Sequence, residues 1–306
     1  MQTAILLGTY NGATFLQEQL DSFAWQTEAD WTLWASDDGS TDDTVQIIRR
    51  FAEKMGDQKV HQLNGPQKGF AANFFSMVKN KAIQADAYAY SDQDDIWIKG
   101  KLERASQFLK TIPSGVPALY CSRTHYVNRN NHSIGYSKKF TKPTIFANAL
   151  VQNIASGNTM VFNQAARDLL LKLEGNPNAE LHDWLTYILV TAAGGKVRFD
   201  MEPSVRYRQH GSNLIGMNTG LYASAYRINL LLFKNRFKRW NDQHIAVLKK
   251  IKHVLMADNQ KILEEFINAR KLNGISRVLV FKKIGLYRQT FLGNLAFYLA
   301  ALINKV

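Results

Sequence analysis

Apolar and polar positions alternate in blocks along the first hundred residues of the chain. Short apolar runs that end at Gly, Asn or Asp indicate buried strands, and the stretches between them repeat apolar residues with the period of a helix. The strand–helix–strand order predicts an α/β fold with a mainly parallel, Rossmann-like sheet flanked by helices. The expected strands cover Ala4–Leu7, Trp31–Ala35, Lys59–Leu63 and Ala85–Tyr90, and one of the expected helices runs from Phe70 to Ala82.

Polar clusters follow three of these strands at the point where each strand ends. They are Thr9-Tyr10-Asn11-Gly12, Asp37-Asp38-Gly39-Ser40 and Ser91-Asp92-Gln93-Asp94-Asp95. In an open parallel sheet, ligands bind beyond the carboxyl ends of the strands. The three clusters are therefore predicted to meet at one edge of the sheet and to form a binding site.

The rest of the chain changes character twice. From about residue 113 to residue 220, short β-like runs alternate with helical stretches, as expected for a second half that packs on the same sheet. From residue 221 to residue 306, the pattern is that of long, basic, amphipathic helices. The prediction is one domain over residues 1–220 and a helical extension over residues 221–306.

The third polar cluster carries the clearest chemistry, because it brings Asp92, Asp94 and Asp95 together. Carboxylate oxygens suit hard cations such as Mg²⁺ or Mn²⁺. Mg²⁺ commonly takes one or two carboxylates together with substrate phosphates, so few protein ligands are needed. A solvated acidic turn is the other interpretation. The position after the fourth strand favours a site in which a cation neutralises a diphosphate leaving group.

The loops after the second and third strands supply two further candidates. Asp38 can accept a hydrogen bond from a base imide N–H or a ribose hydroxyl, and Lys68 precedes the start of a helix, where a cation and backbone N–H groups suit phosphate. Both positions also fit simple helix entries, because Asp, Ser and Thr favour N-caps. Ser40 or Thr41 already supplies the cap, which favours a ligand-binding role for Asp38.

Two polar motifs lie in the second half of the chain. His182-Asp183-Trp184 precedes an apolar helical run, so Asp183 is either a general base that deprotonates an acceptor hydroxyl or an N-cap. The segment from Tyr207 to Asn213 is dense in polar groups for a loop that follows a strand. Arg208 is expected to bind the donor. With Arg208 beside it, His210 is expected to ligate the metal or to contact phosphate, although a lone histidine is more often structural.

Composition indicates where the protein works. Apolar residues make up 46% of the chain and charged residues 21%, which is typical of a globular protein. The single cysteine, Cys121, cannot form an internal disulfide and suggests a reducing compartment. The N-terminus lacks the pattern of a signal peptide, and the longest apolar run, Leu295–Ile303, is well short of the roughly 20 residues that span a bilayer. We therefore expect a cytoplasmic protein without a spanning helix.

The net charge of +13 is concentrated near the C-terminus. Residues 221–306 hold 16 Lys and Arg against 4 acidic residues, so this segment needs an anionic partner or a solvated face. Leu221–Trp240 sets apolar and aromatic side chains beside Lys and Arg, as in an interfacial helix on anionic lipid, and His244–Leu272 carries a helical apolar stripe. We expect peripheral attachment to the inner face of the cell membrane. Packing on the rest of the chain, or on a second subunit in a homodimer, is the alternative.

Five motifs, in this order, resemble those of family 2 glycosyltransferases, and the resemblance covers residues 3–217. More narrowly, the chain looks like the bacterial rhamnosyltransferase-type members that build cell-wall or O-antigen polysaccharide. The ordered set is highly specific for the family and much less specific for the sugar. The motifs are Thr9-Tyr10-Asn11-Gly12, the segment Asp37 to Asp42, the segment Ser91 to Trp97, His182-Asp183-Trp184 and the segment Tyr207 to Asn213.

The resemblance implies a GT-A fold, with residues 1–112 as the nucleotide-binding half and residues 113–220 as the acceptor half. It also implies a metal-dependent, inverting mechanism with Mn²⁺ or Mg²⁺ and a nucleotide-sugar donor. The family often has Glu-Asp where this chain has His182-Asp183, so a role for His182 does not carry over. Carried over by position, Thr9, Tyr10, Asn11 and Asp38 hold the nucleoside, Asp92 lies near the ribose and the metal, Asp94 binds the metal, Asp183 is the base and His210 lies near the diphosphate.

The function expected from this resemblance is transfer of L-rhamnose from dTDP-L-rhamnose to a lipid-linked glycan. A UDP-glucose or UDP-galactose transferase of the same fold is the nearest alternative. A nucleic-acid-binding protein is suggested by charge alone, since no RNP, helix-turn-helix or zinc pattern is present. A binding scaffold without activity is disfavoured because Asp92, Asp94, Asp183 and His210 are all retained.

Overall fold

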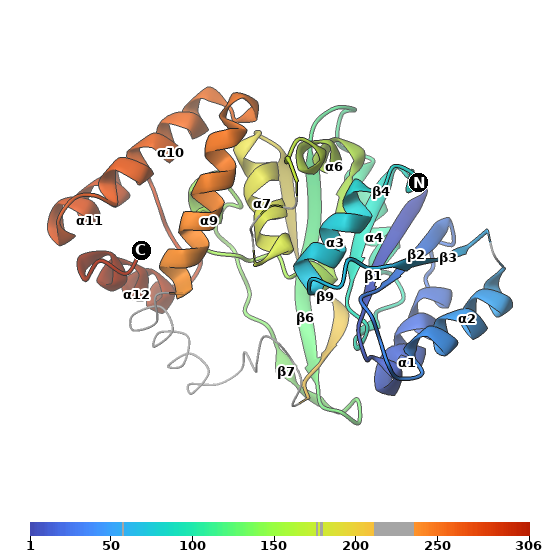
Figure 1. The fold of residues 1–306 in the computed structure, drawn as a ribbon. Helices are drawn as coiled ribbons and strands as arrows, with labels where there is room; N and C mark the ends of the chain where they lie inside the picture. The colour runs from blue at the N-terminus through green and yellow to red at the C-terminus, as the bar shows by residue number, and fades with distance from the viewer. Residues whose placement is uncertain (57, 176, 178–179, 211–235) are drawn as a thin grey trace.

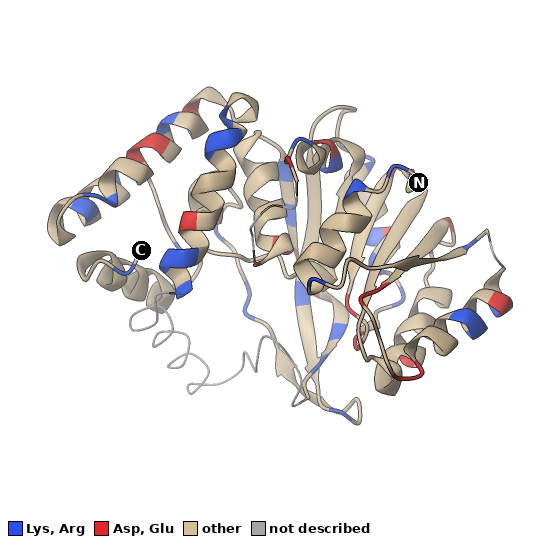
Figure 2. Cartoon of the chain, in the orientation of Figure 1, with Lys and Arg blue, Asp and Glu red and all other residues tan. Residues whose placement is uncertain are grey.

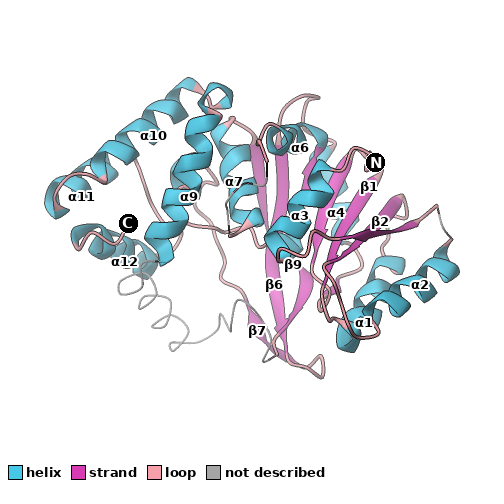
Figure 3. Ribbon diagram, in the orientation of Figure 1, coloured by secondary structure: helices cyan, strands magenta, loops and turns pink. Residues whose placement is uncertain are grey.

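A mixed β-sheet runs through the middle of the molecule, and helices cover both of its faces (Figures 1 and 3). The structure is a computed structural model that describes residues 1–56, 58–175, 177, 180–210 and 236–306. Among these residues, the strands lie in the order β3-β2-β1-β4-β8-β6-β9-β5, and β7 pairs with β6. This arrangement confirms the predicted α/β class.

The first four strands pair in parallel, as the sequence pattern predicts. A helix connects each of these strands to the next, so the carboxyl ends of all four strands lie at one edge of the sheet. The element bounds differ from the predicted ones by at most a few residues. The elements are β1 (Thr3–Thr9), α1 (Ala13–Ala24), β2 (Trp31–Asp37), α2 (Thr44–Met55), β3 (Val60–Asn64), α3 (Phe70–Lys79) and β4 (Ala87–Ser91).

The second half adds strands of both directions. The short strand β8 lies antiparallel between β4 and β6, and β9 runs parallel to β6. Two short strands, β5 and β7, were not expected from the sequence. The elements are β5 (Ile96–Trp97), α4 (Lys101–Leu109), β6 (Ala118–Val127), β7 (Ser133–Tyr136), α5 (Phe146–Ala149), η1 (Gly157–Thr159), β8 (Val161–Asn163), α6 (Gln164–Leu171), α7 (His182–Ala192) and β9 (Lys196–Arg208).

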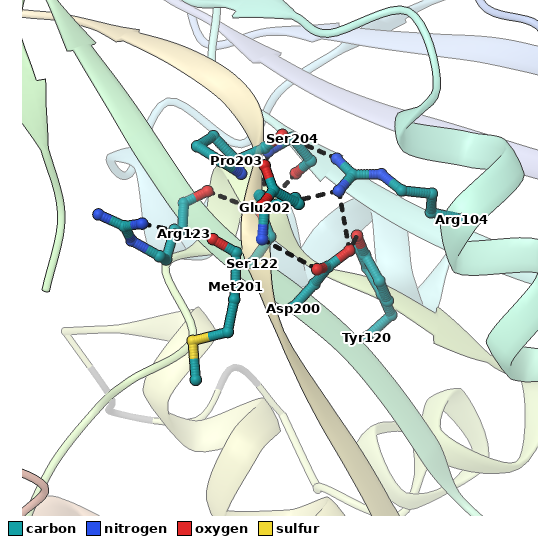
Figure 4. A network of polar contacts seen from close by, with 9 residues as sticks. All are labelled: Arg104, Tyr120, Ser122, Arg123, Asp200, Met201, Glu202, Pro203 and Ser204. Atoms are coloured by element: carbon teal, nitrogen blue, oxygen red, sulfur yellow. Dashed lines mark hydrogen bonds and ion pairs between the residues drawn. The ribbon is translucent and has the colours of Figure 1, made fainter. Parts of the chain in front are cut away.

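Strand β9 is interrupted by a bulge that a polar network stabilises (Figure 4). Ser122 of β6 pairs with Asp200 of β9, but Thr124 pairs with Val205. The segment of β9 between the two pairs is therefore longer than the facing segment of β6. Arg104 reaches across from α4 and binds the Asp200 carboxylate at 2.9 Å and the Pro203 carbonyl oxygen at 2.7 Å. Beyond the bulge, β9 pairs with β5 and delivers its last residues to the edge where β4 ends.

The sheet separates two apolar cores, and β1 shows how. Its side chains alternate, so Ala4 and Leu6 face one core while Ile5 and Leu7 face the other. The core around Ile5 and Leu7 is closed by α1, α2 and α4. The core around Ala4 and Leu6 is closed by α3, α6, α7 and the C-terminal helices.

The C-terminal helices extend this second core. Trp184 of α7 lies 6.1 Å from the ring of Phe237 and 5.7 Å from the ring of Trp240, both of which belong to α9. Ile245, Leu248 and Phe266 are buried, so the described part of the predicted apolar stripe packs on the rest of the chain. The elements are α9 (Arg236–Lys250), η2 (Lys252–Val254), α10 (Ala257–Ala269), α11 (Gly274–Lys283) and α12 (Phe291–Leu302).

Two expectations from the sequence concern residues that the structure does not describe. The boundary near residue 220 and the segment 221–235, which begins the expected interfacial helix, lie outside the described residues. Within the described ranges, no helix is long and apolar enough to cross a bilayer.

Candidate active site

The loops that follow β1 and β2 are tied together by hydrogen bonds. Thr9 donates through Oγ1 to Oδ1 of Asp37 at 2.9 Å. The backbone N–H of Asn11 donates to Oγ of Ser40 at 2.8 Å, and the Asn11 side-chain oxygen accepts from the backbone N–H of Thr41 at 2.9 Å. Asn11 has a φ of 48°, a left-handed conformation that Asn tolerates better than most residues. Two of the predicted donor-binding residues, Thr9 and Asn11, therefore connect the loops after β1 and β2 into one surface. We call this surface, formed by residues 9–12 and 37–41, the ledge.

Asp38 fixes the neighbouring loop between β3 and α3. Its Oδ1 accepts from the backbone N–H of Gln67 at 2.6 Å, and its Oδ2 accepts from the backbone N–H of Gly69 at 2.9 Å. Lys68 lies between these two amides and is exposed. The carboxylate of Asp38 thus holds the turn that presents Lys68, and each of its oxygens keeps a lone pair for a further donor.

The side chain of Gln93 connects the loop after β1 to the acidic cluster through two hydrogen bonds. Its side-chain oxygen accepts from the backbone N–H of Tyr10 at 2.8 Å, and its side-chain NH₂ donates to the Tyr10 carbonyl oxygen at 2.9 Å. A Cβ added at Gly12 would lie 2.2 Å from Oε1 of Gln93, so this glycine permits the close approach. The aromatic side chain of Tyr10 remains 57% exposed above the ledge.

Asp94 and His210 meet directly, although 116 positions separate them in the sequence. Nε2 of His210 lies 2.7 Å from Oδ2 of Asp94, and the imidazole packs 5.0 Å from the ring of Phe15. Both side chains remain partly exposed, at 12% for His210 and 18% for Asp94. Two of the predicted metal-site residues, far apart in the sequence, are thus within reach of one ligand.

Arg208 supports this pair from inside the protein. Its side chain is fully buried, and the guanidinium donates to the Asp94 carbonyl oxygen at 3.1 Å and to Oε2 of Glu18 at 3.0 Å. It also lies 4.6 Å from the ring of Phe15. The guanidinium therefore anchors the acidic loop between β9 and α1.

Asp95, the third acid of the cluster, is fully buried. It accepts hydrogen bonds from the Asn158 side chain and from the backbone N–H of Arg208. Nζ of Lys101 is also buried, donates to the Asn158 carbonyl oxygen at 2.6 Å and lies 3.4 Å from the centre of the Trp97 ring. Asp95 therefore joins β9 and η1 to the acidic loop. Burial lowers the pKa of Lys101 well below its usual range, and the nearby carboxylates of Asp95 and Asp92 oppose that shift.

Asp183 lies in the first turn of α7 and faces the same region. Its Oδ2 accepts from the backbone N–H of Gly157 at 3.1 Å, and its Oδ1 accepts from the backbone N–H of Trp184 at 2.6 Å. Burial raises the pKa of Asp183 to about 6, although these hydrogen bonds and one from Asn153 oppose the shift. The N-cap of α7 is Leu181, so Asp183 itself does not occupy the cap position.

His182 packs as an uncharged ring among aromatic side chains. It stacks on Phe74 at 4.1 Å and meets Tyr90 edge-on at 4.7 Å. Burial lowers the pKa of His182 to about 3, so the imidazole is neutral near pH 7. Neither ring nitrogen has a hydrogen-bond partner among the described residues.

Negative charge accumulates where Asp92, Asp94 and Asp183 approach one another. The pKa of Asp92 is raised to about 7, first by burial and then by the carboxylates of Asp94 and Asp183, while Lys101 opposes the shift. A divalent cation would relieve this repulsion, so the donor set fits such an ion. Among the described residues, no three or more His, Cys, Asp or Glu side chains are grouped so that they could hold a metal ion by themselves.

The structure thus brings the predicted residues to one edge of the sheet, where they form a central group and an outer group. Asp92, Asp94, His210 and Asp183 gather at its centre, while Thr9, Tyr10, Asn11, Asp38 and Lys68 lie on the adjoining loops. Sequence reasoning missed the residues that join these loops, because nothing in the local pattern marks them. They are Gln93, Lys101, Gly157 and Asn158.

Comparison with known sequences gives a consistent family. The sequence model described as Glycosyl transferase family 2 matches residues 4–170, more than half of the chain. The dTDP-rhamnosyl transferase RfbG of Shigella flexneri is 28% identical over 257 residues, which cover 78% of this chain and 83% of that protein. The UDP-Glc:alpha-D-GlcNAc-diphosphoundecaprenol beta-1,3-glucosyltransferase WfgD of Escherichia coli is 24% identical over 246 residues, with coverage of 78% and 83%.

Comparison with solved structures supports the fold. The mannosyltransferase PcManGT from Pyrobaculum calidifontis, solved in complex with GDP-Man and Mn²⁺, superposes with a TM-score of 0.54. The alignment covers 99% of this chain and 85% of that one at 17% identity. This likeness bears on the architecture, which is GT-A-like: a sheet flanked by helices, followed by C-terminal helices.

Proposed function

This chain belongs to glycosyl transferase family 2, and on that premise we propose that it is an inverting, metal-dependent sugar transferase. Its relatives act in polysaccharide synthesis, which sets the general role of the enzyme. The observation that carries the proposal is the contact of Asp94 with His210 at 2.7 Å, beside Asp92 and facing Asp183. This arrangement sets a place for a cation and a diphosphate next to a carboxylate that can accept a proton.

Asp94, Asp92 and His210 would hold a bound Mn²⁺ or Mg²⁺. The cation supplies charge neutralisation for the departing nucleoside diphosphate. Arg208 keeps the acidic loop in position through the Asp94 carbonyl oxygen and so acts on the donor indirectly. Lys68, exposed just before α3 begins, would add a positive charge for the phosphates.

The nucleoside would lie on the ledge formed by the loops after β1 and β2. Thr9 and Asn11 shape that ledge, and the exposed ring of Tyr10 offers a surface for the base. The free lone pairs of Asp38 can accept a base imide N–H or a ribose hydroxyl. Asp92, within the acidic loop, would lie near the ribose and the metal.

Asp183 would act as the general base. It takes the proton of the acceptor hydroxyl while that oxygen attacks the anomeric carbon, and the bond to the diphosphate oxygen breaks in the same displacement. No covalent intermediate is needed, so one carboxylate suffices. The hydrogen bonds from Gly157 and Trp184 hold the carboxylate in a fixed orientation.

The donor we propose is dTDP-L-rhamnose, because RfbG, named as a dTDP-rhamnosyl transferase, covers most of the chain. A UDP-hexose donor is the second candidate, since WfgD, named as a glucosyltransferase that uses UDP-Glc, aligns over an equal share. The name of WfgD also specifies a diphosphoundecaprenol-linked acceptor, which supports a lipid-linked glycan here. A homodimer stays an expectation, and charge alone suggests the nucleic-acid-binding alternative.

A donor panel tests the proposal. Purified chain is incubated with dTDP-rhamnose, UDP-glucose, UDP-galactose and GDP-mannose, with and without Mn²⁺ or Mg²⁺, and nucleoside diphosphate release is measured. We expect release from dTDP-rhamnose to exceed the others and to require a divalent cation. Nucleoside diphosphate release from a UDP-hexose alone would identify the donor as a UDP-hexose. Release that is as fast in a chelator as with Mn²⁺ or Mg²⁺ would contradict the proposed metal dependence.

A further inference from the structure

Helix α12 has an outward face made only of large apolar side chains. On an ordinary surface helix this face is polar. Ala296, Phe297, Ala300 and Ala301 occupy the opposite, buried face. The exposed residues recur at helical spacing along one side, and their exposed fractions run from 42% to 81%. They form what we call the α12 stripe: Phe291, Leu292, Leu295, Leu299, Leu302 and Ile303.

The protein holds α12 firmly, so the stripe belongs to an ordered surface. Oγ1 of Thr290 caps the helix by accepting from the backbone N–H of Gly293 at 3.1 Å. The ring of Phe297 stacks on that of Phe281 in α11 at 5.6 Å. Buried Arg277 donates to the Ala301 carbonyl oxygen at 2.6 Å. An apolar row of this extent on a rigid helix marks an interaction surface.

The surroundings of the stripe are positively charged. Residues 271–306 contain six Lys and Arg and no Asp or Glu, and Figure 2 accordingly draws no acidic residue on α11 or α12. Lys282 is exposed, and its Nζ lies 5.6 Å from the ring of Tyr298 on α12. Just before α12, exposed Lys142 donates from its backbone N–H to Oε1 of Gln289 at 2.9 Å and from Nζ to the Arg288 carbonyl oxygen at 3.3 Å.

We propose that the α12 stripe lies in the headgroup region of an anionic bilayer, with Lys142 and Lys282 on the lipid phosphates. Apolar side chains beside Lys on an amphipathic surface are the pattern of interfacial attachment. A twelve-residue helix is about 18 Å long, which suits a helix lying in the interface and not one crossing a hydrocarbon core of about 30 Å. A second copy of the chain would gain nothing from the excess of basic residues, because like charges would face each other.

The position of the stripe fits the chemistry of the site. In Figure 1, β1 runs from the N-terminus at the top toward the lower edge, and α12 lies at the lower left. The carboxyl edge with the candidate site and the α12 stripe thus lie toward the same end of the molecule. This inference rests on the proposed lipid-linked acceptor for its purpose. It also places the membrane contact on α12. The sequence placed it on Leu221–Trp240, but Phe237 of that segment is buried against Trp184.

Vesicle flotation of the full chain tests the proposal. We compare vesicles of phosphatidylcholine with vesicles of phosphatidylcholine and phosphatidylglycerol, at low and high salt. Wild-type chain should float with the anionic vesicles and dissociate at high salt. The variant Phe291→Glu/Leu295→Glu should lose at least about tenfold in vesicle affinity, because two inserting apolar groups are replaced by anions. Leu171→Glu, on α6 and 43% exposed, is the matched control and should bind as wild type does.

Two readouts keep the result interpretable. Circular dichroism and calorimetric binding of the nucleotide sugar should be equal in the variant and the wild type, since the stripe is separate from the donor site. Absence of donor binding in both proteins would count against the proposed function and not against the stripe. Wild-type binding that the variant retains would overturn the membrane surface. A variant that changes only the mass measured by light scattering would also overturn it and would assign the stripe to a second copy.

Discussion

The backbone N–H of Gly157 donates a hydrogen bond to Oδ2 of Asp183 at 3.1 Å. The next residue, Asn158, donates from its side chain to the buried carboxylate of Asp95 and accepts from Nζ of Lys101 at its carbonyl oxygen. The short turn η1 therefore touches the candidate base with one residue and the acidic loop with the next. It sets the separation between the group that takes the proton and the groups that face the diphosphate.

Adding a methyl group at Gly157 should disturb this arrangement. A Cβ there would lie 3.0 Å from Nε2 of His182 and 3.3 Å from Cβ of Asp183, so the His182 ring and the Asp183 side chain must give way by a few tenths of an ångström. We expect Gly157→Ala to lower kcat by about ten- to a hundredfold, as for other small misplacements of a catalytic group, with donor affinity unchanged. Gly100→Ala is the control, because no heavy atom lies within 4 Å of a Cβ at Gly100. Full turnover by Gly157→Ala, measured in steady state, would show that η1 does not position the base.

Removal of the Asn158 side chain should act on stability as well. Asp95 is fully buried and would lose a side-chain donor, so Asn158→Ala should lower the free energy of unfolding by about 1–3 kcal/mol. Urea titration followed by tryptophan fluorescence measures the change. Asn130→Ala, in an exposed loop, should leave the midpoint where it is. If both variants unfold at the wild-type midpoint, the contact with Asp95 contributes nothing to folding.

The sequence predicts the parallel half of the sheet because each of its strands is a compact apolar run. Trp31 to Ala35 and Ala85 to Tyr90 lie in strands β2 and β4 with ends shifted by a few residues. Strand β9 (Lys196–Arg208) is much longer than the short β-like runs expected in this part of the chain, because its second part depends on the bulge that Arg104 holds from α4. A contact between residues 96 positions apart leaves no trace in local periodicity.

The candidate site also has a part that the sequence predicts and a part that it does not. Its loops could be predicted because polar residues interrupt the chain where strands end, and parallel strands bring those ends together. The supporting contacts could not. Lys101 looks like an ordinary surface lysine at a helix start, yet it is fully buried, and Arg208 looks like a free cation, yet its guanidinium is held by Glu18 and the acidic loop. Burial of a charge depends on partners distant in the sequence.

Loss of the Asp94 carboxylate should separate metal-dependent binding from the rest of donor recognition. Asp94→Ala should weaken nucleotide-sugar affinity in Mn²⁺ by about tenfold or more, as for removal of a metal ligand, because Asp94 and His210 would no longer share the cation. In a chelator, the wild type and the variant should bind equally weakly. Isothermal titration calorimetry with and without Mn²⁺ measures both. Asp258→Ala, on the exposed surface of α10, is the control. A metal response of Asp94→Ala equal to that of the wild type would exclude Asp94 as a ligand.

The pH profile should report the candidate base. Burial raises the pKa of Asp183 to about 6, and a general base works only when it is ionised. Activity should therefore fall as the pH drops through about 6, where Asp183 becomes protonated, and should level off above pH 7 or so. Initial rates at saturating donor and acceptor, between mildly acidic and neutral pH, measure this limb. A profile that stays flat from pH 5 to pH 7 would contradict proton transfer to Asp183.

The strongest single substitution is Asp183→Asn. An amide has nearly the shape of the carboxylate and cannot take a proton. Its single oxygen can accept from only one of the two backbone N–H groups, Gly157 or Trp184, that the two carboxylate oxygens of Asp183 serve. We expect kcat to fall by about a hundredfold to ten-thousandfold while calorimetry gives an unchanged donor affinity. Asp168→Asn makes the same chemical change on the exposed surface of α6 and should be silent. Substantial turnover by Asp183→Asn would remove the base from this position. Loss of donor binding together with activity would instead mean that Asp183, whose charge reaches Asp92, acts on the donor and not on the acceptor proton.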